Sequence, residues 1–311
     1  KTVIEKDEMN CFFVGAGKEN NVLIPLQIVR NDYEQANLQS LTNYYSPLYS
    51  VIPDDLTSDD LSVCFAELRG LNWGTLELKP MSYEGTFNLR KMLNELRIPA
   101  IPFFCFGNWY LPVNNMTFEE YFSTLSSKVK NTVKRKTKKF DRIEGSQVVI
   151  LTSQDEIDEA IYAFETVYTS SWKHPEPYPD FISGLMNIAA MQGSLRVGVA
   201  YLDSKPIASQ LWIVADNTAY IFKLAYDEGY KQYSAGTVLT AKMMQYVIDF
   251  DKVEVVDYLC GDDSYKKDWM SRRRERWGLL IFNTANLRGL IMLCKEMPKY
   301  WLKNLISFLR K

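Results

Sequence analysis

Acidic, phenolic and basic side chains come close together in the segment DDSYKKDW, residues 262–269. Tyr265 and Lys266 follow Asp262 by three and four positions, so on a helix the three side chains share one face. Such a set suits acyl transfer from a thioester to an amine, which needs a base for the ammonium proton and an acid for the leaving thiolate. We predict that Asp262, directly or through water, is the base, that Tyr265 is the acid, and that Lys266 orients or neutralises the substrate.

The residues of this region also have simpler interpretations. Aspartates are common in the first turn of a helix, so Asp262 and Asp263 fit a solvated helix start as well. Under the catalytic interpretation, Asp263 is an alternative base. We predict that Trp269 belongs to the core rather than to the site. Asp257 lies inside an apolar strand, and because a buried carboxylate needs a partner, we predict a structural salt bridge for it.

A turn of small residues precedes this segment in the chain and opens a helix whose apolar positions recur at helical spacing. The first amides of a helix have no partner within it, and the helix dipole favours negative charge there. Gly236 lets a ligand approach the backbone closely. We predict that this turn binds the pyrophosphate of an acyl donor, with ordinary helix capping as the alternative. The predicted donor-binding residues are Tyr233, Ser234, Ala235, Gly236 and Thr237.

The elements that position these residues follow a regular order in the C-terminal part of the chain. Three strands in meander order are separated by the two-residue turns Asp203-Ser204 and Asp216-Asn217, which favour hairpins. The complete predicted order is β-α-α-β-β-β-α-β-α-β, with strands at 148–151, 195–202, 206–214, 218–225, 253–259 and 277–282 and a short helix through Trp269. Because ligands bind at the carboxyl ends of strands in open α/β sheets, we expect both motifs at one edge of a sheet.

The N-terminal part also mixes strands and helices, around a Gly-rich turn at 15–21. A capping box formed by Thr117 and Glu120 starts a helix that runs into the basic segment KVKNTVKRKTKKFDR, residues 128–142. This segment fits a solvated helix face or connector, and it also fits a surface for a phosphate-rich ligand. The predicted domains are 1–115, a basic helical connector at 116–145, and 146–311 with C-terminal helices.

The composition excludes several classes of protein. A net charge of -2 argues against general binding of nucleic acid, so we expect no DNA partner. Five scattered cysteines and a single histidine argue against a metal site and fit reduced thiols in the cytoplasm. We see no apolar run long enough to span a membrane and no signal peptide, although the chain starts without Met.

The order of elements resembles that of the GNAT superfamily of N-acetyltransferases, and two motifs make the resemblance more specific. DEGYKQYSAGTVL is similar to the acyl-donor turn of the CelD-like, FemAB-like branch, and VDYLCGDDSYKKDW to its segment F-D-F-x-x-G-D-x-x-Y-K-x-x-W. The basic helix also resembles one found there. The branch usually has Pro before the turn glycine, where this chain has Ala235. The resemblance implies an α/β fold of tandem GNAT-like domains, with acyl-CoA as co-substrate bound by the C-terminal one.

The resemblance also indicates where an acceptor would bind. In folds of this kind, acceptor contacts come from the loop after the first helix of the domain, which here is the loop WKHPEPYPDF at 172–181. His174 is a substrate contact or a base under this interpretation, and an idle, solvent-exposed side chain under the simpler one. The predicted substrate-binding residues are Trp172, His174, Asp227 and Asp263.

Three functions are consistent with these features. The first is an N-acyltransferase that moves an acyl group, acetyl in the simplest case, from acyl-CoA to an amine on a sugar or a cell-envelope polysaccharide precursor. The second is a FemAB-like transferase that uses aminoacyl-tRNA, against which the acidic composition counts. The third is a non-catalytic scaffold of the same fold, against which the intact G-D-x-x-Y-K-x-x-W segment counts.

The tail at 287–311 is predicted to be a basic amphipathic helix pair. An apolar stripe flanked by lysines and arginines is typical of a helix at a membrane surface, and it is equally typical of a helix packed on its own domain, the interpretation that we favour. We therefore expect a cytoplasmic protein with peripheral membrane contact as a further option. The basic residues of the tail are Lys295, Lys299, Lys303, Arg310 and Lys311.

Overall fold

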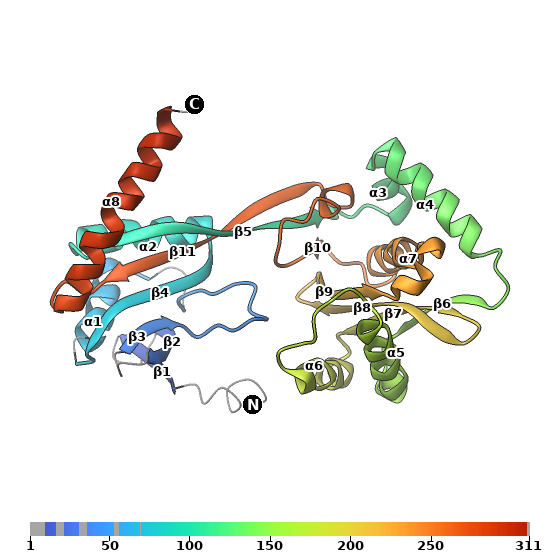
Figure 1. Cartoon of the computed structure of the whole chain (residues 1–311), viewed down its shortest axis with the longest axis horizontal. Helices are drawn as coiled ribbons and strands as arrows, with labels where there is room; N and C mark the ends of the chain where they lie inside the picture. The colour runs from blue at the N-terminus through green and yellow to red at the C-terminus, as the bar shows by residue number, and fades with distance from the viewer. Residues whose placement is uncertain (1–9, 17–21, 31–35, 53–55, 69, 310–311) are drawn as a thin grey trace. The chain divides into compact units, whose positions relative to one another are not determined.

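The computed structural model describes residues 10–16, 22–30, 36–52, 56–68 and 70–309, drawn in colour in Figure 1. Its elements fall into two compact units, which we treat separately. Unit 1 contains the described residues of 3–107 and 274–311, and unit 2 contains 108–273. Part of the predicted Gly-rich turn, 17–21, and the two terminal basic residues, Arg310 and Lys311, lie outside the described residues.

Unit 1 is a mixed sheet with helices packed on it. Strand β2 lies between β1 and β3 in antiparallel pairs, β3 pairs with β4 in parallel, and β4 pairs with β11 in antiparallel. The elements are β1 (Asn10–Ala16), β2 (Val22–Arg30), β3 (Ala36–Ser40), α1 (Ser58–Leu68), β4 (Trp73–Ser82), α2 (Tyr83–Glu95), β5 (Ala100–Pro112), β11 (Arg272–Phe282) and α8 (Leu287–Leu309). The last residues of β5, 108–112, and the first two of β11, 272–273, belong to unit 2.

Unit 2 carries both sequence motifs. Its elements are α3 (Phe118–Thr124), α4 (Ser127–Phe140), β6 (Ser146–Leu151), α5 (Ile157–Thr169), α6 (Pro179–Met191), β7 (Leu195–Leu202), β8 (Lys205–Ala215), β9 (Thr218–Tyr226), α7 (Ala235–Asp249) and β10 (Val255–Asp257). Three short 3₁₀ helices complete it: η1 (Gln154–Glu156), η2 (Glu228–Tyr233) and η3 (Lys266–Asp268). The capping box of Thr117 and Glu120 is present at the start of α3.

Strands β6 to β9 form an antiparallel meander, and β10 joins β9 in parallel and the end of β5 in antiparallel. Both predicted hairpins are confirmed. Asp203-Ser204 and Asp216-Asn217 have positive φ and link strands whose end residues pair directly, as a two-residue turn requires. Helices α5 and α6 cover one face of this sheet, and α7 covers the other together with α3 and α4 (Figure 1).

The core of unit 2 forms where α7 meets the sheet. Val238, Leu239, Met243 and Met244 are fully buried there. Gly198 on β7 makes the close approach possible, because a Cβ at this position would lie 2.5 Å from Sδ of Met243. The basic helix α4 turns its few apolar side chains to the same core and most of its lysines and arginines to solvent, as the solvated-face interpretation predicts.

Three expectations about secondary structure need correction. The tail is one helix, α8, rather than a pair, and it continues through Pro298. The strand predicted at 253–259 is limited to Val255–Asp257. The helix predicted from Asp262 to Trp269 is reduced to the 3₁₀ helix Lys266–Asp268, and residues 262–265 before it form an irregular segment and a turn.

The domain limits at 115 and 145 stay a prediction. In the contacts of the described residues, α4 lies within unit 2 and α8 within unit 1. Among these residues, none of the helices is both long enough and apolar enough to span a membrane.

Candidate active site

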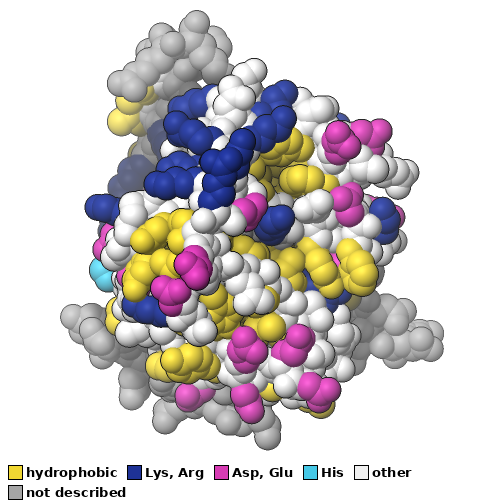
Figure 2. Space-filling model, turned by 90° about the vertical axis from the view of Figure 1, so that its right-hand side faces the viewer, with side chains coloured by type: hydrophobic (Ala, Val, Ile, Leu, Met, Phe, Trp, Pro, Cys, Tyr) yellow, Lys and Arg dark blue, Asp and Glu magenta, His cyan; other side chains and the backbone are white. Residues whose placement is uncertain are grey.

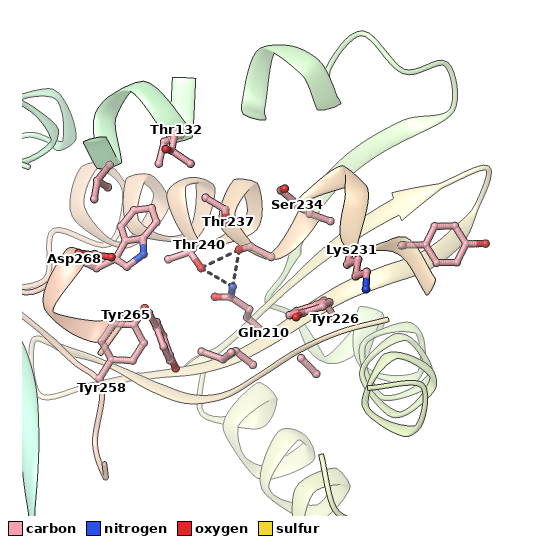
Figure 3. A pocket seen from close by; sticks show the side chains of 18 of the residues that line it. Thr132, Gln210, Tyr226, Lys231, Ser234, Thr237, Thr240, Tyr258, Tyr265 and Asp268 are labelled. Carbon is pink, nitrogen blue, oxygen red and sulfur yellow. Dashed lines mark hydrogen bonds between the residues drawn. The ribbon is translucent and has the colours of Figure 1, made fainter. Parts of the chain in front are cut away.

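Unit 2 contains a cavity of about 550 Å³ that brings α4, α7 and the loop after β10 together (Figure 3). The predicted donor turn and the predicted acid both contribute to it. Its polar and aromatic lining residues are Lys128, Thr132, Trp172, Gln210, Tyr226, Tyr230, Lys231, Ser234, Thr237, Thr240, Tyr258, Tyr265, Asp268 and Trp269, with Ala235 and Gly236 between them. The sequence motifs therefore meet at one cavity, as the position of the strand ends predicts.

The start of α7 leaves two backbone amides available. Ser234, the N-cap residue, has φ +55° and makes no side-chain cap. The amide of Ser234 donates to Lys231 O at 3.1 Å, and that of Thr237 donates to Ser234 O at 3.0 Å. The amides of Ala235 and Gly236 have no hydrogen bond to another described residue. With no acidic residue in the first turn of α7, these two groups form a site that favours an anion.

Gln210 on β8 fixes this helix start from below. Its side chain is buried, and Nε2 donates to Thr240 Oγ1 at 2.7 Å and to Gly236 O at 3.3 Å (Figure 3). Its Oε1 accepts from Trp212 Nε1 at 3.0 Å, which sets the orientation of the amide group. The first turn of α7 is thus attached to the sheet by a polar side chain whose own hydrogen bonds are satisfied.

Gly236 itself is not required by the packing of the protein. A Cβ at this position would lie 3.6 Å from Cδ1 of Tyr226, an ordinary contact. The space in front of Gly236 belongs to the cavity, so a small residue here keeps room for a ligand rather than for another part of the chain.

Tyr265 lines the cavity and holds its proton firmly. Its ring packs edge-on against Tyr258, with 5.9 Å between ring centroids. Burial, and then the negative charge of Asp263, raise the pKa of Tyr265 to about 12. The phenol is therefore protonated at neutral pH, the state that a proton donor needs.

Asp262 points elsewhere, although it precedes Tyr265 by only three residues. Its carboxylate accepts from Arg273 Nη2 at 2.6 Å and from Trp109 Nε1 at 2.7 Å, and it is not among the described residues that line the cavity. The hydrogen bond from Arg273 lowers the pKa of Asp262, and the hydrogen bond from Trp109 acts in the same direction. Because the segment is not a helix, the prediction that Asp262, Tyr265 and Lys266 share one face is wrong.

Lys266 is buried and binds the backbone of its own loop. Its Nζ donates to Cys260 O at 2.5 Å and to Gly261 O at 3.3 Å, and it pairs with Asp263 at 3.2 Å. The absence of a side chain at Gly261 matters here, because a Cβ would lie 3.1 Å from this Nζ. In this structure, Lys266 holds the loop that carries Tyr265.

The remaining predicted binding residues divide into one that lines the cavity and several that do not. Trp172 lines it and packs against Tyr226, with ring centroids 4.5 Å apart. His174 is exposed, and Tyr233 packs beside the core with Tyr230.

Two predicted aspartates hold local structure. Asp227 caps η2, accepting from Gly229 N at 2.9 Å, and pairs with Lys205 at 3.2 Å. Asp263 is exposed and pairs with Lys266. Asp257, for which a salt bridge was predicted, is buried and accepts from Asn108 Nδ2 and from Leu259 N, both at 2.6 Å.

Several lining residues had no signal of their own in the sequence. Lys128 and Thr132 lie in a basic segment in which nothing distinguishes them from their neighbours. Asp268 follows Asp262 and Asp263, and nothing in the sequence marks it as the aspartate that lines the cavity. Gln210 could have been found, because it is a polar residue within the apolar strand IASQLWIV. Within the described ranges, we find no group of three or more His, Cys, Asp or Glu side chains arranged to hold a metal ion.

Comparisons with known proteins agree with this architecture. Residues 127–267 match the family model described as the acetyltransferase (GNAT) domain. No curated protein matches the sequence of the chain.

Among solved structures, FemX superposes with a TM-score of 0.63 and 8% identity, over 93% of this chain and 92% of FemX. A conserved protein of unknown function from Bacteroides thetaiotaomicron superposes at 0.58 and 12% identity, over 85% and 83%. The C-terminal domain of a provisionally named lysylphosphatidylglycerol synthetase from Agrobacterium fabrum superposes at 0.56 and 11% identity, over 91% and 87%.

These similarities span most of each chain at low identity, so they show the fold. They confirm the prediction of an α/β protein with tandem GNAT-like domains. The CelD-like, FemAB-like branch remains a prediction from the two motifs. Residues 127–267 are thus similar to the GNAT acetyltransferase domain, and this match supports a transferase.

Proposed function

We propose that unit 2 transfers an acyl group from acyl-CoA to an amine. The observation that carries the proposal is the cavity in which the free amides of Ala235 and Gly236 and the protonated phenol of Tyr265 face the same space. A donor that is anionic at one end and has a thiolate leaving group at the other matches both features.

The diphosphate of the donor would lie on the first turn of α7. Lys128 and Lys231 line the same cavity and supply positive charge, and Gln210 keeps the amides in place. The cavity volume of about 550 Å³ is in the range of sites for cofactor-sized ligands. The residues present therefore fit an acyl-CoA.

In the reaction, the amine nitrogen attacks the thioester carbonyl, the bond from carbon to sulfur breaks, and the thiolate takes the proton of Tyr265. Solvent then returns a proton to the phenolate. The ammonium proton leaves before the attack, to a carboxylate or to water, and the nitrogen gives a second proton to water as the carbon–sulfur bond breaks, so that a neutral amide forms. Asp262 remains our sequence-based candidate for the base, but its pairing with Arg273 weakens its basicity, whereas Asp268 lines the cavity directly. Comparing Asp262→Asn with Asp268→Asn separates these two bases.

An amine on a sugar or a cell-envelope polysaccharide precursor is the proposed acceptor, in a cytoplasmic setting where acyl-CoA is present. This part of the proposal rests on the resemblance of the two motifs. Trp172 is the predicted acceptor contact that lies at the cavity. His174 and Asp263 lie outside its lining, and we propose for them at most a contact with the outer part of an acceptor.

A second candidate is a transferase that takes its donor from aminoacyl-tRNA. The observation that favours it is the exposed basic face of α4, whose first turns line the cavity and whose later turns do not. Figure 2 shows lysine and arginine side chains gathered over this part of unit 2. Its exposed basic residues are Lys128, Lys134, Arg135, Lys138 and Lys139. A phosphate backbone would follow such a face, with salt-dependent affinity.

Titration calorimetry with acetyl-CoA, with longer acyl-CoAs and with aminoacyl-tRNA distinguishes these candidates. Under the first, acetyl-CoA binds, and reversing Lys134, Arg135, Lys138 and Lys139 to Glu leaves its affinity nearly unchanged. Under the second, tRNA binds with a steep salt dependence and the same reversal abolishes binding. A folded protein that binds none of these ligands refutes both and leaves the non-catalytic scaffold.

A further inference from the structure

Helix α8 presents apolar side chains on two different faces. One face packs on unit 1, where Leu293 and Met297 are partly buried. On the same side, the guanidinium of Arg90 lies over the ring of Tyr300, at 5.6 Å from its centroid. This face accounts for the packing that the sequence predicts for the helix.

The second face is exposed at the described side chains between Leu287 and Ile306. Trp301 is 68% exposed and Ile291 is 59% exposed. At about 100° per residue, the exposed apolar residues fall on one continuous arc, turned away from the packed face. They are Leu287, Leu290, Ile291, Trp301, Leu302, Leu305 and Ile306. A large apolar surface of this kind on a soluble protein marks an interaction site.

A row of lysines runs along one edge of this arc. Lys295, Lys299 and Lys303 follow one another at spacings of four residues and are exposed. Of the charged residues in Leu287–Leu309, four are basic, with Arg288 the fourth, and one is acidic, Glu296, which pairs with Lys299 at 2.8 Å. The helix is thus locally positive in a chain whose net charge is -2.

We propose that this face of α8 binds the surface of a bilayer that contains anionic phospholipid. An apolar arc with a lysine edge matches acyl chains below and phosphate groups beside them. Trp301, with a large ring and one polar N–H, is suited to the boundary between the two. A second copy of the protein fits less well, because it would bring the same lysine row without an acidic row to meet it.

The test uses the full chain and sedimentation with vesicles of phosphatidylcholine, with and without phosphatidylglycerol. We expect binding to the anionic vesicles at low salt, and weaker binding as salt increases. Changing Trp301 and Leu302 together to Glu should abolish binding. Reversing Lys295, Lys299 and Lys303 to Glu should weaken it at least tenfold, since lysines near an anionic surface each contribute to the attraction.

Met191→Glu is the matched control, because Met191 is an exposed apolar residue on α6 of unit 2. This variant should bind vesicles as the unchanged protein does. The proposal is overturned if the folded full chain does not bind anionic vesicles at low salt, or if it binds equally after the change at Trp301 and Leu302. It is also overturned if sedimentation velocity shows a dimer that this change dissociates while no vesicle binding occurs.

Discussion

The two units contain the same local construction, a strand that leads to a helix with serine at the N-cap, but they use it differently. In unit 1, β4 leads into α2, and Ser82 has φ -64° and accepts from Gly85 N at 3.0 Å. In unit 2, β9 leads through η2 to α7, and Ser234 has φ +55° with no side-chain cap. One serine satisfies an amide of its helix, and the other leaves the next two amides available.

The charges and the space around the two helix starts also differ, and both differences favour an anionic ligand at α7. Glu84 lies in the first turn of α2, whereas the first turn of α7 has no acid. The cavity beside Ser82 has a volume of about 210 Å³, compared with about 550 Å³ beside Ser234. Serine at a helix start is thus not a sign of a ligand site by itself. The free amides, the missing carboxylate and the larger space together distinguish the site from the capped helix.

The strongest test of this contrast is the loss of one tyrosine hydroxyl at each cavity. Tyr265→Phe should lower kcat by about 10²–10⁴-fold, the usual effect of removing a general acid. Tyr49→Phe removes the hydroxyl of a tyrosine at the unit 1 cavity, which donates to Pro25 O at 3.0 Å, and should leave kcat nearly unchanged. Turnover is measured with the acceptor that supports activity.

His174→Ala provides a second control, since His174 lies outside the cavity lining in the described structure. It should reduce turnover far less than Tyr265→Phe. Near-native turnover of a folded Tyr265→Phe variant would refute the assignment of the acid, and loss of all activity in His174→Ala would move the chemistry to the 172–181 loop.

A large side chain at the start of α7 should have the next largest effect, a loss of affinity for the donor. Gly236→Trp is expected to raise the dissociation constant of acyl-CoA at least tenfold, about 1.4 kcal/mol, because the indole would occupy the space in front of the free amides. Gly236→Ala should change it little, since the added Cβ makes only an ordinary contact. Gly184→Trp on α6 is the matched control, because a Cβ there meets no atom within 4 Å. Equal affinities for all three variants would contradict the site.

An acidic residue in the first turn of α7, like the one that α2 already has, should reduce the affinity for the donor by a smaller factor. Thr237→Glu places a carboxylate in the first turn of α7, and we expect donor affinity to fall roughly two- to fivefold, in line with about 0.3–1 kcal/mol for a charge at a helix end. The loss should shrink at high salt. Thr237→Gln, with the same shape and no charge, separates electrostatics from size. Equal effects of Glu and Gln would assign the loss to size alone.

The sequence predicted the order of elements well because the hairpins and helices depend on local patterns. Asp203-Ser204 and the apolar spacing after Gly236 act within a few residues, and both are found as expected. The meeting of the donor turn and Tyr265 at one edge of the sheet was also predicted, since the two follow neighbouring strands.

The sequence did not predict the directions in which the side chains of residues 259–266 point. The shared face of Asp262, Tyr265 and Lys266 depended on a helix, but residues 261–263 have no regular structure, 264–265 form a turn, and the 3₁₀ helix begins only at Lys266. Arg273 pairs with Asp262 from the start of β11, a contact that depends on tertiary structure and leaves no local pattern. Gln210 similarly gains its role only because α7 lies above it.

The two N-cap serines also predict different effects on stability. Ser82→Ala should lower the free energy of unfolding by about 1 kcal/mol, because Gly85 N loses its partner. Ser234→Ala should change it much less, since this side chain makes no cap. Chemical denaturation of the two variants measures the difference. Equal losses would show that the contrast between the two helix starts is not energetic.

The smallest expected effect concerns the pH dependence of stability, at the ion pair between Asp262 and Arg273. The folded-state pKa of Asp262 lies below its ordinary value of 3.8, so the stabilisation is present above that pH and is lost as pH falls through the folded pKa. Because both side chains are partly exposed, the contribution is modest.

Asp262→Asn should flatten the loss of stability between neutral pH and about pH 3. In an Arg273→Gln background, Asp262→Asn should have a clearly smaller effect, because the partner that lowers the pKa of Asp262 most is gone and the hydrogen bond from Trp109 remains. If Asp262→Asn flattens the curve equally with and without Arg273, the pair is not its cause. If kcat falls in Asp262→Asn but not in Arg273→Gln, Asp262 acts as a base in spite of the pair.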